Sequence, residues 1–401
     1  MAQFGDFTVD RNSTKYVLGS GGTIISYPTD EPAFEFNADG SYKGLLVEPA
    51  ATNICKQSED ISTTWTASGD TTVTANDTTA PDGNSTADKL GDNGLGGTGT
   101  DFVYVNQAIT VVAETKYTGS FFVKADGLSF CALTVLGITT GGANADQFFG
   151  LSGAGTVGSL SGNLDNATIE AYPNDWYRCS ITWTQGAGDT SVSFRIYVAN
   201  SISSVAVDGD GTSSIFVWGA QVEASPIATS YIPTTTASVT RVKDDITLGS
   251  ASSLIGQTEG TLYVEVDWRL ATGVSQYLLE ASDNSGNNRI LIYNDGGTVK
   301  LTIYVQANGG SPEAQQGVSS TGFSGIQKIA FAYKTDDFEL YRNGSSISSS
   351  TSGSLAALGT LTDIDIGQQL GRTDQANMWI RAVALYPKRL SDAECEALTT
   401  L

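Results

Sequence analysis

Apolar and polar residues alternate over many short stretches of this chain, which is the pattern of a strand with one buried face. Clusters of Gly, Asp and Asn, such as residues 82–84 and 208–211, separate these stretches as tight turns do. Between residues 55 and 243 the pattern predicts an antiparallel β-sandwich or jelly roll. The side chains expected to face its core are Tyr117, Gly119, Phe121, Val123, Cys179, Ile181, Trp183, Val192, Phe194, Ile196 and Val198.

A second series of strands follows the polar stretch YIPTTTASVTRVKDD and predicts another sandwich over residues 244–401. Asn343-Gly344 predicts a two-residue hairpin turn, because a type I′ turn needs positive φ at both positions. Ser391 and Glu394 have capping-box spacing and predict a helix over residues 391–398, which we expect to plug one end of the sandwich. In the first strand of the series, the residues on one face are Leu262, Val264, Val266, Trp268 and Leu270.

Residues 1–54 have a sparser pattern, in which short apolar pairs lie between turn signals such as Asp39-Gly40. They hold too few apolar residues for a core of their own, so they are expected to pack on a neighbouring subunit or the next domain, or to cover the following sandwich. The expected fold is therefore all-β. It has an extended, β-rich N-terminal arm (1–54) and two antiparallel β-sandwich, or jelly-roll, domains (55–243 and 244–401).

The chain is strongly acidic, with a formal net charge of -22 over its 401 residues and no stripe of basic residues. A surface this negative repels phosphate, so we expect no nucleic-acid partner. No apolar run approaches the roughly 20 residues that a membrane-spanning helix needs, and no signal-peptide pattern begins the sequence. We therefore expect synthesis in the cytoplasm and no membrane insertion.

The chain contains no histidine, which removes the commonest general base and excludes Ser-His-Asp and Cys-His catalysis. Its four cysteines lack the CxxC spacing of a zinc or redox site. Cys131 and Cys179 lie in apolar strand patterns, so we interpret them as buried thiols rather than disulfide partners. The sequence therefore shows no active site, and we expect no enzyme.

Sugar-binding sites pair an aromatic platform with carboxylates and amides that bind hydroxyl groups. Trp65, in the loop-like STTWTASGD, and Tyr104, in DFVYVNQ, are the candidates for such a platform, although an ordinary place in the core is the alternative for each. The remaining tryptophans lie inside strand patterns and are expected in the cores: Trp176, Trp183, Trp218, Trp268 and Trp379.

Two acidic loops have the oxygen-rich composition that calcium prefers. Asp208 and Asp210 lie in the sequence DGDG, and Asp283 lies in SDNSGNN. Neither loop matches the EF-hand pattern, so the alternative is a solvated turn. Structural calcium is the one cofactor that the sequence suggests.

Three blocks of the chain, GLLVEPAATN, WYRCSITWT and FVWGAQVEASPIATSYIPT, resemble those of tailed-phage fibre and spike proteins. The stretch that contains the last two also resembles the carbohydrate-binding-module jelly rolls of such fibres. Towards the C-terminus, TLYVEVDWRL, FELYRNG and MWIRAVALYPKRLSDAECEAL look like parts of concanavalin-like lectin (laminin-G-like) sandwiches.

Glycanases of the concanavalin-like fold carry an ExDxxE-type motif, and Glu265 and Asp267 match its start. Leu270 stands where the second glutamate would be, so the resemblance is to the binding branch of the fold.

This resemblance implies a structural protein of the phage virion surface, made in the host cytoplasm: a tail fibre, spike or similar appendage that adheres to host surface polysaccharide. It further implies that the arm attaches to other virion proteins and that the chain forms a homotrimer, in which several weak sugar sites act together. Two alternatives are a capsid decoration or head-spike protein that stabilises the shell without binding sugar, and a glycan hydrolase or lyase.

Overall fold

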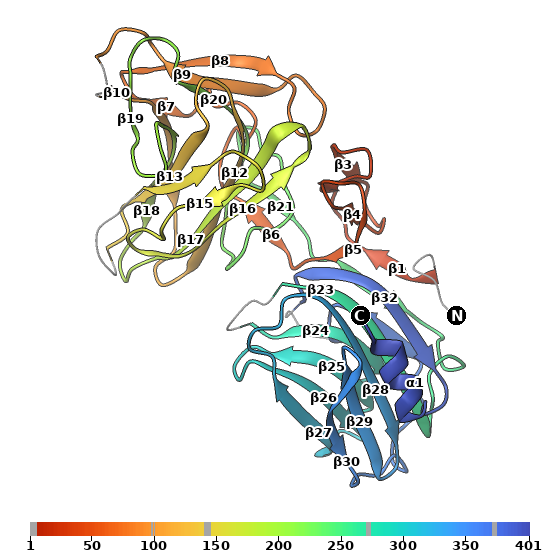
Figure 1. Ribbon diagram of the computed structural model, residues 1–401. Helices are drawn as coiled ribbons and strands as arrows, with labels where there is room; N and C mark the ends of the chain where they lie inside the picture. The colour runs from red at the N-terminus through yellow and green to blue at the C-terminus, as the bar shows by residue number, and fades with distance from the viewer. Residues whose placement is uncertain (1–5, 98, 100, 140–145, 270–273, 371–374) are drawn as a thin grey trace.

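The chain begins in one β-sandwich, leaves it to form a second, and returns to complete the first (Figure 1). The computed structural model describes residues 6–97, 99, 101–139, 146–269, 274–370 and 375–401. The second body, a jelly roll, is inserted between β5 (Tyr42–Val47) and β22 (Asp245–Leu248) of the first, the C-terminal sandwich. The predicted all-β fold with two antiparallel sandwiches is confirmed.

The C-terminal sandwich consists of two antiparallel, seven-stranded sheets, which we call the front sheet and the back sheet. The front sheet contains, in order, β1 (Thr8–Asp10), β22, β31 (Asp363–Ile366), β24 (Gln276–Ser282), β25 (Arg289–Asp295), β26 (Lys300–Gln306) and β27 (Pro312–Ser319). The back sheet contains β30 (Ser345–Ser350), β29 (Asp337–Arg342), β28 (Gly325–Lys334), β23 (Glu259–Trp268), β32 (Met378–Tyr386), β5 and β4 (Phe34–Phe36).

The jelly roll consists of two antiparallel, six-stranded sheets. Jelly-roll sheet 1 contains β15 (Thr156–Val157), β14 (Gln147–Gly150), β13 (Phe130–Leu136), β18 (Ser191–Ala199), β11 (Tyr104–Thr110) and β7 (Thr66–Ala67). Jelly-roll sheet 2 contains β16 (Leu164–Tyr172), β17 (Trp176–Thr184), β12 (Lys116–Ala125), β20 (Ser214–Glu223), β9 (Ala87–Asp92) and β8 (Thr71–Thr78). A further pair joins β10 (Asp101–Phe102) to β19 (Ala206–Val207), and the 3-10 turn η2 (Pro173–Asp175) precedes β17.

Two short ladders lie at the junction of the bodies. The strand that enters the jelly roll, β6 (Ala51–Asn53), pairs antiparallel with the strand that leaves it, β21 (Val239–Arg241). Beside them, β2 (Lys15–Leu18) and β3 (Ile24–Tyr27) form a hairpin. The chain therefore crosses between the bodies twice, and the two crossings are hydrogen-bonded to each other.

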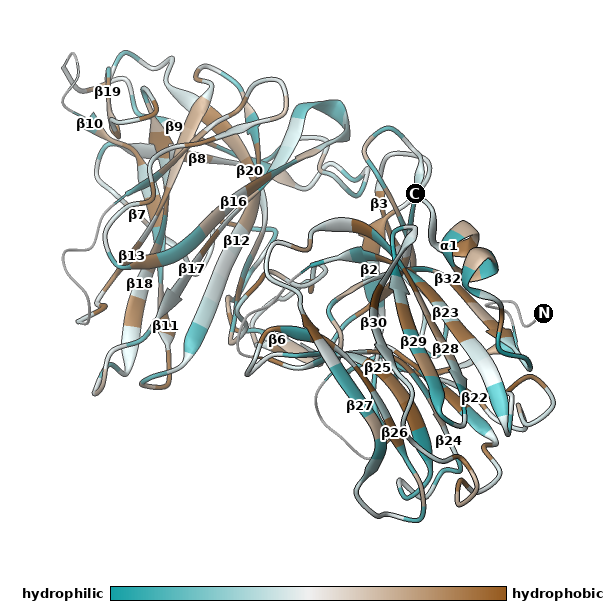
Figure 2. Ribbon diagram, turned by 60° about the horizontal axis from the view of Figure 1, so that its bottom comes forward, coloured by the Kyte–Doolittle hydropathy of each residue, from teal (hydrophilic) through white to brown (hydrophobic). Residues whose placement is uncertain are grey.

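Each sandwich has its own core, built from the strand faces that the alternation predicted. Figure 2 shows hydrophobic and hydrophilic positions interleaved along the strands of both bodies. Of the residues predicted to face inward, those that the structure places in the two cores are Tyr117, Phe121, Val123, Cys179, Ile181, Trp183, Val192, Phe194, Ile196, Val198, Leu262, Val264, Val266 and Trp268. Leu270 lies outside the described residues. All four cysteines are free and buried, which confirms the expectation for Cys131 and Cys179.

The hairpin turn and the helix cap are both confirmed. Asn343 and Gly344 have φ values of 48° and 83° and connect β29 to β30. In α1 (Asp392–Thr399), the Ser391 hydroxyl accepts from Glu394 N while the Glu394 carboxylate accepts from Ser391 N.

The position of α1 differs from the prediction, because the helix packs on the outer face of the back sheet rather than at an end of the sandwich (Figure 1). Ala330 and Ala332 on β28 leave room for Cys395 and Leu390 there. Among the residues that the structure describes, none lies in a helix long and apolar enough to cross a membrane.

The N-terminal segment also differs from the expected extended arm. Its β1 forms an edge of the front sheet and pairs with β22, while β5 adds to the back sheet beside β32. Val9, Leu45 and Val47 enter the core of the C-terminal sandwich, so burial of their side chains favours this position over an exposed one. The segment therefore completes the C-terminal sandwich, not the jelly roll that follows it in sequence.

Five charged side chains meet where the N-terminal segment and the two crossings come together. We call Arg11, Lys15, Glu48, Arg241 and Asp244 the buried ion cluster. The Asp244 carboxylate lies 2.9 Å from Arg11 Nη1 and 2.6 Å from Lys15 Nζ. The Glu48 carboxylate lies 3.1 Å from Lys15 Nζ and 3.5 Å from Arg241 Nη2. All five side chains are at most 1% exposed.

Main-chain groups from both bodies complete this cluster. The jelly-roll residue Ser230 donates its backbone N–H to Glu48 Oε1 at 2.7 Å, and Lys15 Nζ donates to the carbonyl of Leu46 at 2.7 Å. Burial alone would raise the pKa of Glu48, but Lys15 and Arg241 lower it well below its usual value. Because a buried charge without a partner is very unfavourable, the cluster fixes the crossings in one arrangement.

The β2–β3 hairpin lies between the two bodies and packs on both. Ile24 enters an aromatic cluster on jelly-roll sheet 2 that contains Phe122 and Trp218, whereas Val17 packs with Trp379 on the outer face of the back sheet. A further contact joins the bodies directly, since Lys43 Nζ on β5 lies 2.8 Å from the carboxylate of Glu170 on β16. The bodies are thus held together by apolar as well as charged contacts.

Replacing Asp244 by Asn should lower the free energy of unfolding by about 3–5 kcal/mol, because Arg11 and Lys15 would remain buried without their shared counter-ion. Denaturant titration followed by tryptophan fluorescence measures this loss.

The matched control is Asp165→Asn, which breaks a half-exposed pair with Lys116 (3.2 Å) and should cost less than about 1 kcal/mol. Equal losses for the two variants would contradict the role given to the cluster.

Candidate functional site

The outer face of the front sheet combines aromatic rings with acidic side chains. Ile246, Leu279, Ile292 and Ile364 on neighbouring strands face the core, so alternate residues of the same strands face outward. Since α1 and the β2–β3 hairpin occupy the outer face of the back sheet, the front sheet is the remaining face for a ligand; Tyr293 and Tyr304 are half-buried there.

Tyrosine rings form the aromatic part of this face. Tyr277 on β24 and Tyr293 on β25 are opposite each other, and their rings stack with centroids 5.3 Å apart and planes 17° apart. Tyr304 on β26 lies opposite Leu291 and beside the half-buried Arg289, whose guanidinium is 5.8 Å from the Tyr304 centroid. Tyr293 and Tyr304 are half-buried, which suits stacking against the apolar side of a sugar ring, whereas Tyr277 is only 6% exposed and supports the ring of Tyr293 from beneath.

Two carboxylates lie next to each other on the same face. Glu280 on β24 is directly opposite Asp365 on β31, and both are buried. Leu370 donates its backbone N–H to Glu280 Oε2 at 2.7 Å. Burial raises the pKa of Glu280 to about 7, and burial together with the charge of Glu280 raises the pKa of Asp365 to about 7.

A pocket of about 210 Å³ opens beside these carboxylates. It is lined by Lys243, Asp245, Thr247, Asn284, Asp363, Asp365, Gln368, Gln369 and Leu370. Gln368 Nε2 donates to the carboxylates of both Asp245 and Asp365, and Lys243 Nζ lies 3.4 Å from Asp245 Oδ2. The pocket is therefore acidic and rich in hydrogen-bond acceptors. None of its described lining residues is a tyrosine, but Glu280, which is opposite its Asp365, lies three residues from Tyr277 along β24.

Two other hollows lie elsewhere on the chain. A wider one of about 490 Å³ on the jelly roll is lined by Glu59, Asp60 and Pro233 among others and, like the front-sheet pocket, has no aromatic ring among its described lining residues. Another, at the junction of the bodies, holds only about 20 Å³, which is room for about one water molecule.

The structure places Trp65 in the core of the jelly roll, where it is 7% exposed. Its ring packs against Phe194, with centroids 6.4 Å apart, and its Nε1 donates to the carbonyl of Gln57. The loop-like sequence around Trp65 suggested a surface position, but burial of the large ring stabilises the sandwich instead. Trp65 therefore presents no platform to a sugar. The tryptophans predicted in the cores are all buried.

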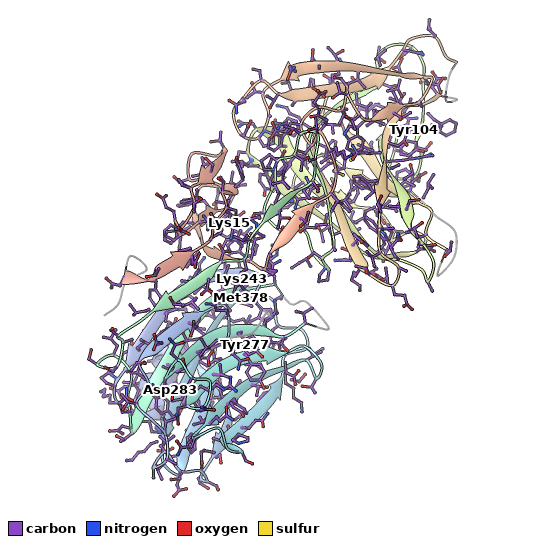
Figure 3. All side chains as sticks on the ribbon, turned by 180° about the vertical axis from the view of Figure 1, so that it is seen from behind. Lys15, Tyr104, Lys243, Tyr277, Asp283 and Met378 are labelled. Carbon is purple, nitrogen blue, oxygen red and sulfur yellow. The ribbon has the colours of Figure 1, made fainter. Side chains whose placement is uncertain are left out.

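Tyr104 is half-buried on the outer face of jelly-roll sheet 1 (Figure 3). Its ring centroid lies 4.7 Å from that of Tyr197, and the guanidinium carbon of Arg195 lies 4.7 Å from the same centroid. Arg195 Nη1 donates to the Tyr197 hydroxyl at 2.9 Å. Tyr104 stays a predicted glycan-binding residue, now within a group that the sequence did not indicate.

The three predicted calcium ligands do not come together. Asp208 and Asp210 lie in a loop of the jelly roll, whereas Asp283 lies in the C-terminal sandwich (Figure 3). Asp210 and Asp283 each cap a turn, accepting from the backbone N–H of Thr212 and Ser285 respectively at 3.0 Å. Within the described part of the chain, no three His, Cys, Asp or Glu side chains are grouped to hold a metal.

The E-x-D sequence on β23 lies on the outer face of the back sheet. Glu265 Oε1 accepts from Arg381 Nε at 2.8 Å, and its other oxygen accepts from the Tyr263 hydroxyl at 3.2 Å. Burial raises the pKa of Asp267. Glu265 thus stabilises the sheet and its contact with the N-terminal segment, since Arg381 also donates to the carbonyls of Tyr42 and Lys43.

Residues 240–395 match the family profile described as the concanavalin A-like lectin/glucanases superfamily. The C-terminal sandwich is a concanavalin A-like, laminin-G-like domain. The matched span leaves out β1, β4 and β5, which the structure shows to complete its two sheets. Among curated proteins, no sequence matches the chain.

Several solved structures show a distant likeness. The CBM40 of the Ruminococcus gnavus IT-sialidase is 15% identical with a TM-score of 0.31, covering 37% of this chain and 86% of that one. The binding domain of botulinum neurotoxin DC, in complex with rat synaptotagmin II, is 15% identical with a TM-score of 0.34, covering 39% and 40%. The leech intramolecular trans-sialidase is 15% identical with a TM-score of 0.31, covering 37% and 24%. At TM-scores this low the likeness supports no conclusion about ligand or activity.

The sequence analysis missed Tyr277, Tyr293, Glu280 and Asp365. Each lies beside an apolar residue of its strand, but no strand was assigned to these segments from the sequence. The pairing of β24 with β31 and β25, which brings the four together, is not visible in the local pattern.

Replacing Glu280 by Gln should make the protein more stable at pH 8 by on the order of 1–3 kcal/mol. The pKa of Glu280 is raised in the folded state, so folding retains protons that the unfolded chain releases, and stability falls as the pH rises from about 4 through 7. Denaturant titrations at pH 5 and pH 8 test this.

At pH 5 the variant and the wild type should be nearly equal, because protonated Glu280 resembles Gln. The control is Glu313→Gln on β27, which is half-exposed and leaves the buried pair intact. A Glu280→Gln variant with unchanged pH dependence would contradict this account.

Proposed function

We propose that this protein is a glycan-binding adhesin of a phage virion surface, and that the outer face of the front sheet binds the glycan. The observation that carries the proposal is the acidic pocket on the same sheet face as the Tyr277–Tyr293 stack, within a domain that matches the lectin/glucanases superfamily. Aromatic rings contact the C–H face of a sugar, while carboxylates and amides accept hydrogen bonds from its hydroxyl groups.

The virion part of the proposal is supported by the resemblance of the three sequence blocks to phage fibre and spike proteins. In a homotrimer, three front-sheet faces and three Tyr104 groups would act together, which raises the overall affinity of weak sites. The N-terminal segment would attach the chain to other virion proteins through surfaces that its strands leave outside the sandwich. A capsid decoration protein without sugar binding is the alternative that the same resemblance allows.

Glu280 and Asp365 favour hydrolysis of a glycan as the second candidate function. Two neighbouring carboxyl groups with a pKa of about 7 provide a proton donor and a base near neutral pH. Release of reducing ends from bound polysaccharide would establish hydrolysis, and Glu280→Gln should abolish that release.

Tyr293→Ala should weaken binding to immobilised bacterial surface polysaccharides by about tenfold, since it removes the more exposed ring of the stack. Tyr293→Phe is the matched control and should retain most of the affinity, because the ring remains. Biolayer interferometry with folded variants measures both effects.

Tyr104→Ala, on the jelly roll, tests which of the two candidate faces binds the glycan: the outer face of jelly-roll sheet 1 or the outer face of the front sheet. If Tyr104→Ala abolishes binding and Tyr293→Ala does not, the glycan site lies on the jelly roll. If the wild type binds no polysaccharide at saturating concentration, the proposed adhesin function fails, and imaging of the protein on capsid faces would support decoration.

A further inference from the structure

Hydrogen-bond acceptors dominate the pocket on the front sheet. Three aspartates line it, Asp245, Asp363 and Asp365, and Lys243 is the one cation among its described lining residues. Lys243 already has partners within the pocket. Its Nζ lies 3.4 Å from Asp245 Oδ2 and donates to Gln368 Oε1 at 3.3 Å. The negative charge of the other two aspartates, Asp363 and Asp365, is therefore not neutralised by any basic side chain among the described residues that line the pocket.

Two buried oxygens beside these aspartates lack a donor. Gln369 lines the pocket and is 4% exposed, yet its Oε1 has no hydrogen-bond partner among the described residues. Glu280 is 0% exposed, and its Oε1 is likewise without a partner in the described part of the chain. A buried acceptor without a donor is unfavourable, so both oxygens favour a ligand that brings donors.

A ligand that brings further acceptors would be disfavoured. A carboxylate or phosphate on the ligand would face Asp363 and the ionised form of Asp365 at close range, and like charges brought together across an interface are strongly repelled. An ammonium group carries up to three N–H donors and a positive charge, so it meets both requirements of the pocket.

We propose that this pocket binds an amine-bearing glycan, with the ammonium group between Asp365 and Gln369, and that it discriminates against acidic sugars. The inference rests on the proposed glycan-binding function and narrows its ligand class. A hydroxyl-rich neutral sugar satisfies the acceptors without the charge, so it should bind with intermediate affinity.

The test measures the binding of three tetrasaccharides to the full chain by calorimetry at pH 7 and low salt: those of glucosamine, N-acetylglucosamine and galacturonic acid. The glucosamine tetramer should bind at least about tenfold more tightly than the galacturonic acid tetramer, and added salt should reduce the difference. Asp365→Asn should remove most of this preference, whereas Glu313→Gln, outside the pocket, should retain it. If Asp365→Asn does not fold, Asp363→Asn replaces it.

Three results would overturn the inference: equal or tighter binding of the acidic tetramer, a preference that Asp365→Asn leaves unchanged, or binding that requires calcium and is lost with a chelator. Absence of binding by all three tetramers overturns it as well. In each case, binding of the wild type to the immobilised bacterial surface polysaccharides would still support the adhesin function. Failure of the inference about amine-bearing glycans can therefore be distinguished from failure of the proposed adhesin function.

Discussion

The buried ion cluster is the constraint on which the rest of the structure depends. Arg11 and Asp244 are 233 residues apart along the chain, yet their side chains meet at 2.9 Å with almost no exposure to solvent. Such charges are tolerated only when each has its partners, so the segments that carry them must arrive together. The cluster therefore specifies how the chain leaves one sandwich and returns to it.

This arrangement explains why a jelly roll can be inserted into the sandwich without separating its two parts. The entering and leaving strands, β6 and β21, are hydrogen-bonded to each other directly beside the cluster. Glu48 accepts a hydrogen bond from Ser230 of the jelly roll while it pairs with Lys15 and Arg241. The same few residues thus join the sheet edges of the sandwich to the inserted body, and they leave the outer face of the front sheet available for the candidate site.

Local features could be predicted from the sequence because they depend on neighbouring residues. The inward faces of the strands, the Asn343-Gly344 turn and the Ser391–Glu394 cap all follow from short-range geometry. The place of the N-terminal segment could not be predicted, since Val47 pairs with Met378 and Thr8 with Thr247, and no local pattern specifies such registers. The same holds for the candidate site, whose Glu280 and Asp365 meet only through pairing of β24 with β31.

The most direct test is native-state hydrogen exchange of the backbone amides of β5 and β32, which pair in the back sheet. If the N-terminal segment is an integral part of the sandwich, both strands should exchange only with global unfolding and show the same free energy of opening. Exchange of β5 orders of magnitude faster than that of β32 would show that the segment behaves as a separate arm, and would contradict the account.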